Sequence, residues 1–176
     1  MKKIDWNNVE EAKGFEKLPA GAYICGITAV EDEPTKEYLK FEADIAEGEF
    51  KNYYRNLYEA KGFWGLHFIK SYKEKAQGFF KKMLTAFENS NPNFRFDNDE
   101  KILKRKLIGL VIGYEEYEGN DGSIKERVQV VDFISIDDVR KGNFTVPALK
   151  KLEIENLSNY VGTETQSDIS DEDLPF

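Results

Sequence analysis

The chain has 176 residues, of which 40% are hydrophobic and 33% charged, and its formal net charge is −8. This length fits one domain with a short extension, because domains usually hold about 100–200 residues. A single cysteine excludes an internal disulfide. The N-terminus lacks the apolar run that is typical of a signal peptide or a membrane span. We therefore expect a cytoplasmic protein without membrane contact.

The first third of the chain predicts a lead-in and three strands. The lead-in, residues 1–18, carries the apolar residues Trp6, Phe15 and Leu18 among charges, and we expect these side chains to hold it on the domain. Residues 22–30 are rich in β-branched and aromatic side chains, which predicts a first strand. Residues 38–45 alternate apolar and polar side chains, as a half-buried second strand does. The aromatic stretch 50–58 predicts a third strand.

The rest of the chain predicts one helix, two strands and a closing segment. Apolar residues recur at spacings of three and four between Phe68 and Phe87, which predicts an amphipathic helix. Residues 107–117 and 124–136 predict a fourth and a fifth strand around a turn rich in Gly, Asn and Asp. Apolar residues from 144 to 154 predict a segment that packs on the sheet.

The order of these elements predicts the fold class. Three strands, a helix and two more strands follow one another as in the five-stranded OB barrel, while a generic α+β sheet is the alternative. We therefore predict a mainly β protein: an OB-fold barrel over residues 1–161, with a helix between strands three and four. Residues 162–176 are polar and acidic, which predicts a disordered tail.

The charge is unevenly distributed along the chain. Residues 61–106 hold eleven Lys and Arg against five Asp and Glu, whereas residues 163–176 hold five acidic residues and no basic one. Local charge decides whether phosphates bind, so the net negative charge does not exclude a nucleic-acid partner.

The C-terminal tip carries the most specific motif. An acidic run precedes an apolar residue, a proline and a phenylalanine; the residues concerned are Asp168, Asp171, Glu172, Asp173, Leu174, Pro175 and Phe176. This tip resembles that of bacterial and phage single-stranded DNA-binding proteins, with Leu174 where many relatives have Ile. Residues 18–46, Phe50 and residues 142–151 are similar in pattern to the single-strand binders of phages and integrative elements. The resemblance implies binding of single-stranded DNA and recruitment of replication or recombination proteins.

The chemistry of the tip supports a protein partner. Pro175 restricts the backbone and so lowers the entropy lost on docking, while Phe176 offers a large apolar side chain beside a carboxylate. We expect a partner with a small apolar pocket, an arginine at its mouth and basic residues around it. A solvating tail without a partner is the alternative, and it leaves the apolar triplet unexplained.

Aromatic and basic residues alternate in the middle of the chain, which is typical of surfaces that bind single strands. Bases stack on exposed rings while Lys and Arg neutralise phosphates. The candidates are Lys51, Tyr53, Tyr54, Arg55, Tyr58, Lys61, Phe63 and Trp64. Rings buried in the core are the alternative for Tyr53, Tyr54, Tyr58 and Trp64.

Two further stretches are candidates for DNA contact. The hairpin predicted around residue 120 carries Tyr114, Tyr117, Lys125 and Arg127, and the loop between strands four and five of OB proteins commonly contacts the nucleic acid. A plain exposed hairpin is the alternative, because Glu115, Glu116 and Glu118 in the same stretch would repel phosphates. The basic run Lys104, Arg105 and Lys106 is suited to backbone phosphates or forms a solvated face.

Nothing in the sequence predicts an enzyme. The one histidine, His67, has no Cys or His at a spacing that would complete a zinc site, and no phosphate-binding glycine motif occurs. We therefore expect a protein without metal or cofactor that coats single-stranded DNA with little sequence preference. The alternatives are a protein-interaction module and a recombination mediator or annealing protein. The sequence carries no signal for assembly, so a homo-oligomer stays an open alternative.

Overall fold

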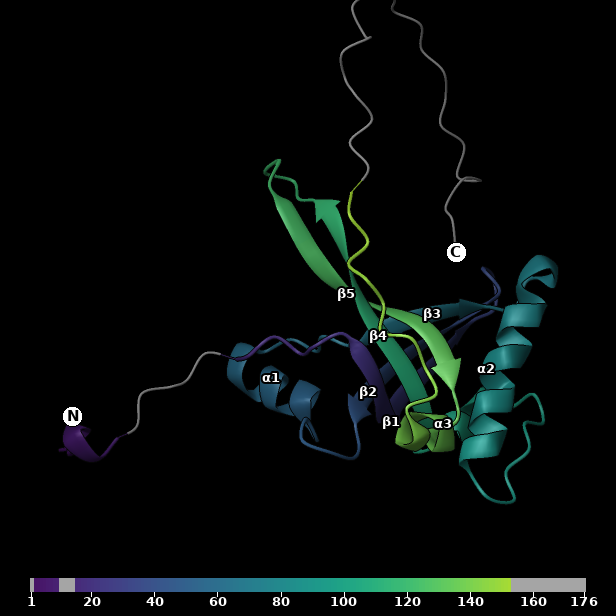
Figure 1. The fold of residues 1–176 in the computed structure, drawn as a ribbon, viewed down its shortest axis with the longest axis horizontal. Helices are drawn as coiled ribbons and strands as arrows, with labels where there is room; N and C mark the ends of the chain where they lie inside the picture. The colour runs from purple at the N-terminus through teal and green to yellow at the C-terminus, as the bar shows by residue number, and fades with distance from the viewer. Residues whose placement is uncertain (1, 10–14, 153–176) are drawn as a thin grey trace, which may run out of the picture.

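The computed structural model describes residues 2–9 and 15–152. Five antiparallel strands form one sheet in the order β3-β2-β1-β4-β5 (Figure 1). The strands are β1 (Gly21–Glu33), β2 (Tyr38–Ile45), β3 (His67–Ser71), β4 (Leu107–Glu118) and β5 (Ile124–Ile134). The helices are α1 (Tyr53–Lys61), α2 (Gln77–Ser90) and α3 (Ile136–Lys141), with 3-10 turns at Trp6–Asn8, Glu74–Ala76 and Glu100–Leu103. The predicted mainly β fold, with a helix between strands three and four, is confirmed.

The predicted barrel does not close. Among the described residues no main-chain pairing joins β3 to β5, so the sheet stays open along this seam. Side chains cross the seam instead: the ring centroids of Phe68 and Phe133 lie 5.6 Å apart, and Lys70 Nζ lies 4.7 Å from the centroid of Phe133. Lys82 of α2 adds an ion pair to Asp132 of β5 at 2.5 Å.

The alternation read from residues 38–45 is confirmed in β2. Its apolar side chains are all buried, and Phe41 stacks on Phe68 at a centroid distance of 4.8 Å. Phe80, Met83 and Phe87 of α2 complete this core. Figure 1 shows α1 and α2 on opposite sides of the sheet.

The third predicted strand is wrong, because most of residues 50–58 form α1 rather than a strand. Tyr54 and Leu57, three residues apart, form the buried side of this helix, and Gly62 ends it in a left-handed conformation with φ 76°. The true third strand is β3, which occupies the start of the predicted helix, so that α2 begins only at Gln77.

Both faces of β4 are covered over residues 108–113. Ile108, Leu110 and Ile112 point into the core. On the other face, α3 and the closing segment cross at two glycines, because a Cβ on Gly109 would lie 2.6 Å from Val139 Cγ2, and one on Gly113 would lie 3.0 Å from Pro147 Cβ. The closing segment therefore packs on the sheet as expected, but through Pro147, whereas Val146 and Leu149 are exposed.

The lead-in is held as predicted at two of its three apolar residues. Leu18 is buried, and the rings of Phe15 and Tyr53 pack in a T-shaped arrangement with their centroids 6.2 Å apart. Trp6 is 63% exposed and does not serve as an anchor.

Candidate nucleic-acid interface

A buried carboxylate of β2 sets the position of α1. Asp44 is 7% exposed and accepts main-chain hydrogen bonds from Ile45 at 2.8 Å, Tyr54 at 2.9 Å and Arg55 at 3.2 Å. The residue before the helix, Asn52, makes no side-chain cap. Asp44 therefore satisfies the free N–H groups at the helix start, where a negative charge is favourable.

Aromatic and basic side chains gather on the exposed side of α1 and on the loop that follows it. Tyr58 is 51% and Phe63 55% exposed, while the half-buried Trp64 lies against Tyr58 at a centroid distance of 6.2 Å. Trp64 is held in place because its Nε1 donates to the Ala43 carbonyl at 3.1 Å. We call the following five residues the α1 site: Arg55, Tyr58, Lys61, Phe63 and Trp64.

No carboxylate within residues 2–9 and 15–152 forms an ion pair with the cations of the α1 site. Arg55 and Lys61 are exposed, and within the described ranges neither forms an ion pair; the same is true of Lys51 just before the helix. Glu59 is the one carboxylate between residues 53 and 64. These ammonium and guanidinium groups are therefore available to phosphates.

Three predicted stacking residues are engaged within the fold. Tyr54 is 3% exposed, so its ring has no accessible face. The Tyr53 hydroxyl donates to the Glu16 carbonyl at 2.9 Å and accepts from the Leu18 N–H at 3.2 Å. The Tyr114 hydroxyl donates to the Leu18 carbonyl at 2.5 Å, and burial raises its pKa to about 12. Tyr53 and Tyr114 therefore hold the lead-in.

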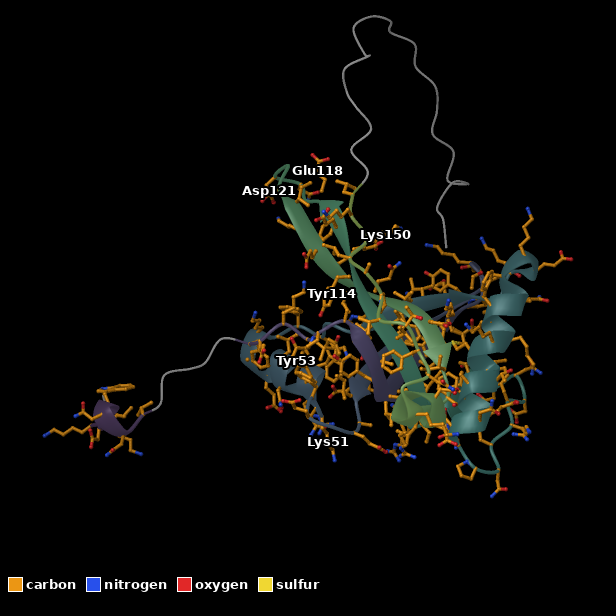
Figure 2. The ribbon with its side chains drawn as sticks, in the orientation of Figure 1. Lys51, Tyr53, Tyr114, Glu118, Asp121 and Lys150 are labelled. Carbon is orange, nitrogen blue, oxygen red and sulfur yellow. The ribbon has the colours of Figure 1, made fainter. Side chains whose placement is uncertain are left out.

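The cations of the β4–β5 hairpin are neutralised by neighbouring carboxylates. Arg127 pairs with Glu115 at 2.6 Å, and Lys125 pairs with Asp121 at 3.1 Å. Arg127 also lies over the Tyr117 ring, at 5.5 Å from the centroid. In Figure 2 Glu118 and Asp121 lie at the tip of the hairpin, on the opposite side of the molecule from Lys51. The predicted hairpin residues therefore do not join the α1 site.

The basic run before β4 lies closer to the α1 site. Arg105 N donates to the Ile27 carbonyl at 2.9 Å, and Ile27 pairs with Ala43, which binds Trp64. Two main-chain contacts and one side-chain hydrogen bond therefore connect this turn to Trp64. Lys104 and Arg105 are exposed and without ion pairs in the described residues, whereas Lys106 lies 4.8 Å from the Phe94 ring centroid.

Asp44 could not be identified from the sequence, because a polar residue in an alternating strand is expected to face solvent.

The tip residues and the predicted tail boundary at residue 162 lie outside the described residues. No helix in the described part of the chain is both long and apolar enough to cross a membrane. Comparisons with models of known protein families and with curated proteins gave no match.

Proposed function

We propose that the chain binds single-stranded DNA through the α1 site, with little dependence on base sequence, and recruits replication or recombination proteins through its C-terminal tip. The observation that carries the proposal is the exposure of Tyr58 and Phe63 beside the unpaired cations Arg55 and Lys61. Rings that are free on one face stack on bases, and unpaired cations displace counterions from phosphates.

The sheet supports this proposal through its topology. We propose that it is a variant of the OB fold in which side chains of β3, β5 and α2 replace the last row of main-chain pairing. OB proteins bind oligonucleotides on the face formed by strands two and three. The α1 site adjoins that face, because Trp64 donates to β2 and lies three residues before β3.

The direct test is a titration with oligo-dT, followed by tryptophan fluorescence. Trp6→Phe leaves Trp64 as the only tryptophan, so that the signal reports on the α1 site. We expect quenching and an affinity that falls steeply as salt rises. The absence of any binding at low salt would overturn the proposal and favour the protein-interaction module.

Matched variants assign the binding to the α1 site. We expect Tyr58→Ala and Phe63→Ala each to weaken binding by about 1–3 kcal/mol, the range for loss of one base stack. Phe79→Ala is the control, because Phe79 is 71% exposed and belongs to α2, which Figure 1 shows away from α1. Equal losses in the three variants would show that DNA does not use this site.

A further inference from the structure

A hollow of about 330 Å³ lies on the outer face of the sheet, next to the α1 site. Its volume is at the lower end of the range of small-molecule sites, about 300–1,000 Å³. The strand register arranges its outward-facing residues in two rows across β1, β2 and β3; they are Ala29, Glu42 and His67 in one row, and Glu31, Lys40 and Ile69 in the other.

The side chains of this hollow combine a flat ring, an acceptor and a donor. The His67 Nε2 atom lies 3.1 Å from Glu42 Oε1, and this contact holds the imidazole ring in place. In the described residues Glu31 has no hydrogen bond or ion pair to its carboxylate. Lys40, which lies directly opposite Glu31, makes a long contact to Glu33 at 3.8 Å, and its Nζ lies 5.9 Å from the centroid of the Tyr38 ring. Its ammonium group is therefore able to turn to a ligand.

We infer that this hollow binds a guanine base of the single strand, with Glu31 as the residue that selects it, so that one position adds a base preference to binding that otherwise depends little on sequence. The inference rests on the proposed function. A carboxylate accepts two parallel hydrogen bonds, and among the four DNA bases only guanine offers two adjacent donors on its Watson–Crick edge, N1–H and the 2-amino group. Lys40 Nζ then donates to the neighbouring guanine O6, and the base stacks on the His67 ring.

The position of the hollow agrees with a strand that also occupies the α1 site. Trp64 and His67 are three residues apart, which corresponds to about 10 Å of extended chain. The hollow carries Glu31 and Glu42, so phosphates are not expected to lie in it. A strand whose phosphates follow the α1 cations and whose base turns inward avoids that repulsion.

The test compares oligo-dT with the same oligonucleotide carrying one central deoxyguanosine or one deoxyinosine, which lacks the 2-amino group. With the full chain we expect the deoxyguanosine oligonucleotide to bind about tenfold more tightly than oligo-dT, near the lower end of what a bidentate base contact provides. We expect deoxyinosine to lose most of that gain. Equal affinity for all three would overturn the inference while leaving the proposed function intact, and failure to bind any of them would overturn the proposed function itself.

Substitutions then identify the selecting residue. Glu31→Gln removes the two-acceptor edge, so we expect it to abolish the preference for the deoxyguanosine oligonucleotide over oligo-dT. Glu118→Gln at the hairpin tip is the matched control and should keep the preference. A preference that survives in Glu31→Gln would show that guanine is read elsewhere. Circular dichroism of both variants checks that they fold.

Discussion

The Asp44 carboxylate stabilises α1 from outside the helix. It accepts three main-chain hydrogen bonds in a nearly solvent-free position, and hydrogen bonds to charged groups contribute about 1.5–3 kcal/mol each. We expect Asp44→Asn to lower the free energy of unfolding by about 2 kcal/mol, because an amide group turns a donor toward N–H groups. Urea unfolding measures this change.

The position of α1 determines the position of the proposed DNA contacts, so the same variant has a second readout. We expect Asp44→Asn to weaken oligo-dT binding even at temperatures at which the protein remains folded. Asp97→Asn is the control, since Asp97 is exposed and accepts a single long hydrogen bond at 3.3 Å. A stable Asp44→Asn variant with normal binding would contradict the role given to this carboxylate.

Asp138 gives the stability a dependence on pH. Hydrogen bonds from Ser135 and then from Asn143 lower the pKa of Asp138 below its ordinary value. Because the pKa is lower in the folded than in the unfolded chain, its contribution is present at neutral pH and is lost as pH falls through the folded pKa. We expect Asp138→Asn to destabilise at neutral pH and to differ little from the parent protein in strong acid. Urea midpoints across this pH range measure the effect.

At the scale of the elements, β4 depends on the absence of a side chain at Gly109. A Cβ there would lie 2.6 Å from Val139 Cγ2 and 2.8 Å from the Ile134 carbonyl oxygen. We therefore expect Gly109→Ala to destabilise the protein by about 1–3 kcal/mol through overpacking. In Gly78→Ala, where the new Cβ meets nothing within 4 Å on α2, we expect instead a gain of about 0.5–1 kcal/mol. Thermal unfolding of the two variants should show shifts of opposite sign.

The elements also show which patterns in the sequence suffice for prediction. The strict alternation of β2 predicted its bounds, since one buried face imposes a period of two. The aromatic stretch 50–58 was wrongly predicted as a strand, because its aromatic residues have high strand propensity, whereas the spacing of Tyr54 and Leu57 suits the helix that forms. The capping group of that helix, Asp44, comes from a different element, and no local pattern reveals it.

The candidate site was predicted in part for a similar reason. The stretch that supplies the α1 site could be read from its composition, because aromatic and basic residues lie close together in the chain. The sequence does not reveal which of these rings are exposed, since Tyr53 binds the lead-in and Tyr54 lies in the core. The two rows of the hollow join three strands by register, so no contiguous stretch of sequence contains them.

At the scale of the whole molecule, the acidic end and the basic middle of the chain are expected to compete. Residues 163–176 carry five acidic side chains, and residues 61–106 have an excess of basic ones. Deletion of residues 168–176 should therefore tighten DNA binding at low salt, and the difference should fade as salt screens the charges. Affinity measured across a salt series tests this, and values that do not differ at any salt concentration would reject the competition.

The open seam between β3 and β5 makes one side of the domain more compliant than the other. A row of main-chain hydrogen bonds breaks cooperatively, whereas a ring contact and an ion pair yield singly and re-form quickly. Because no main-chain bonds join them in the described residues, we expect the two edge strands to move apart more readily than β1, β2 and β4. We therefore expect the curvature of the sheet to adjust to a strand that lies on its outer face.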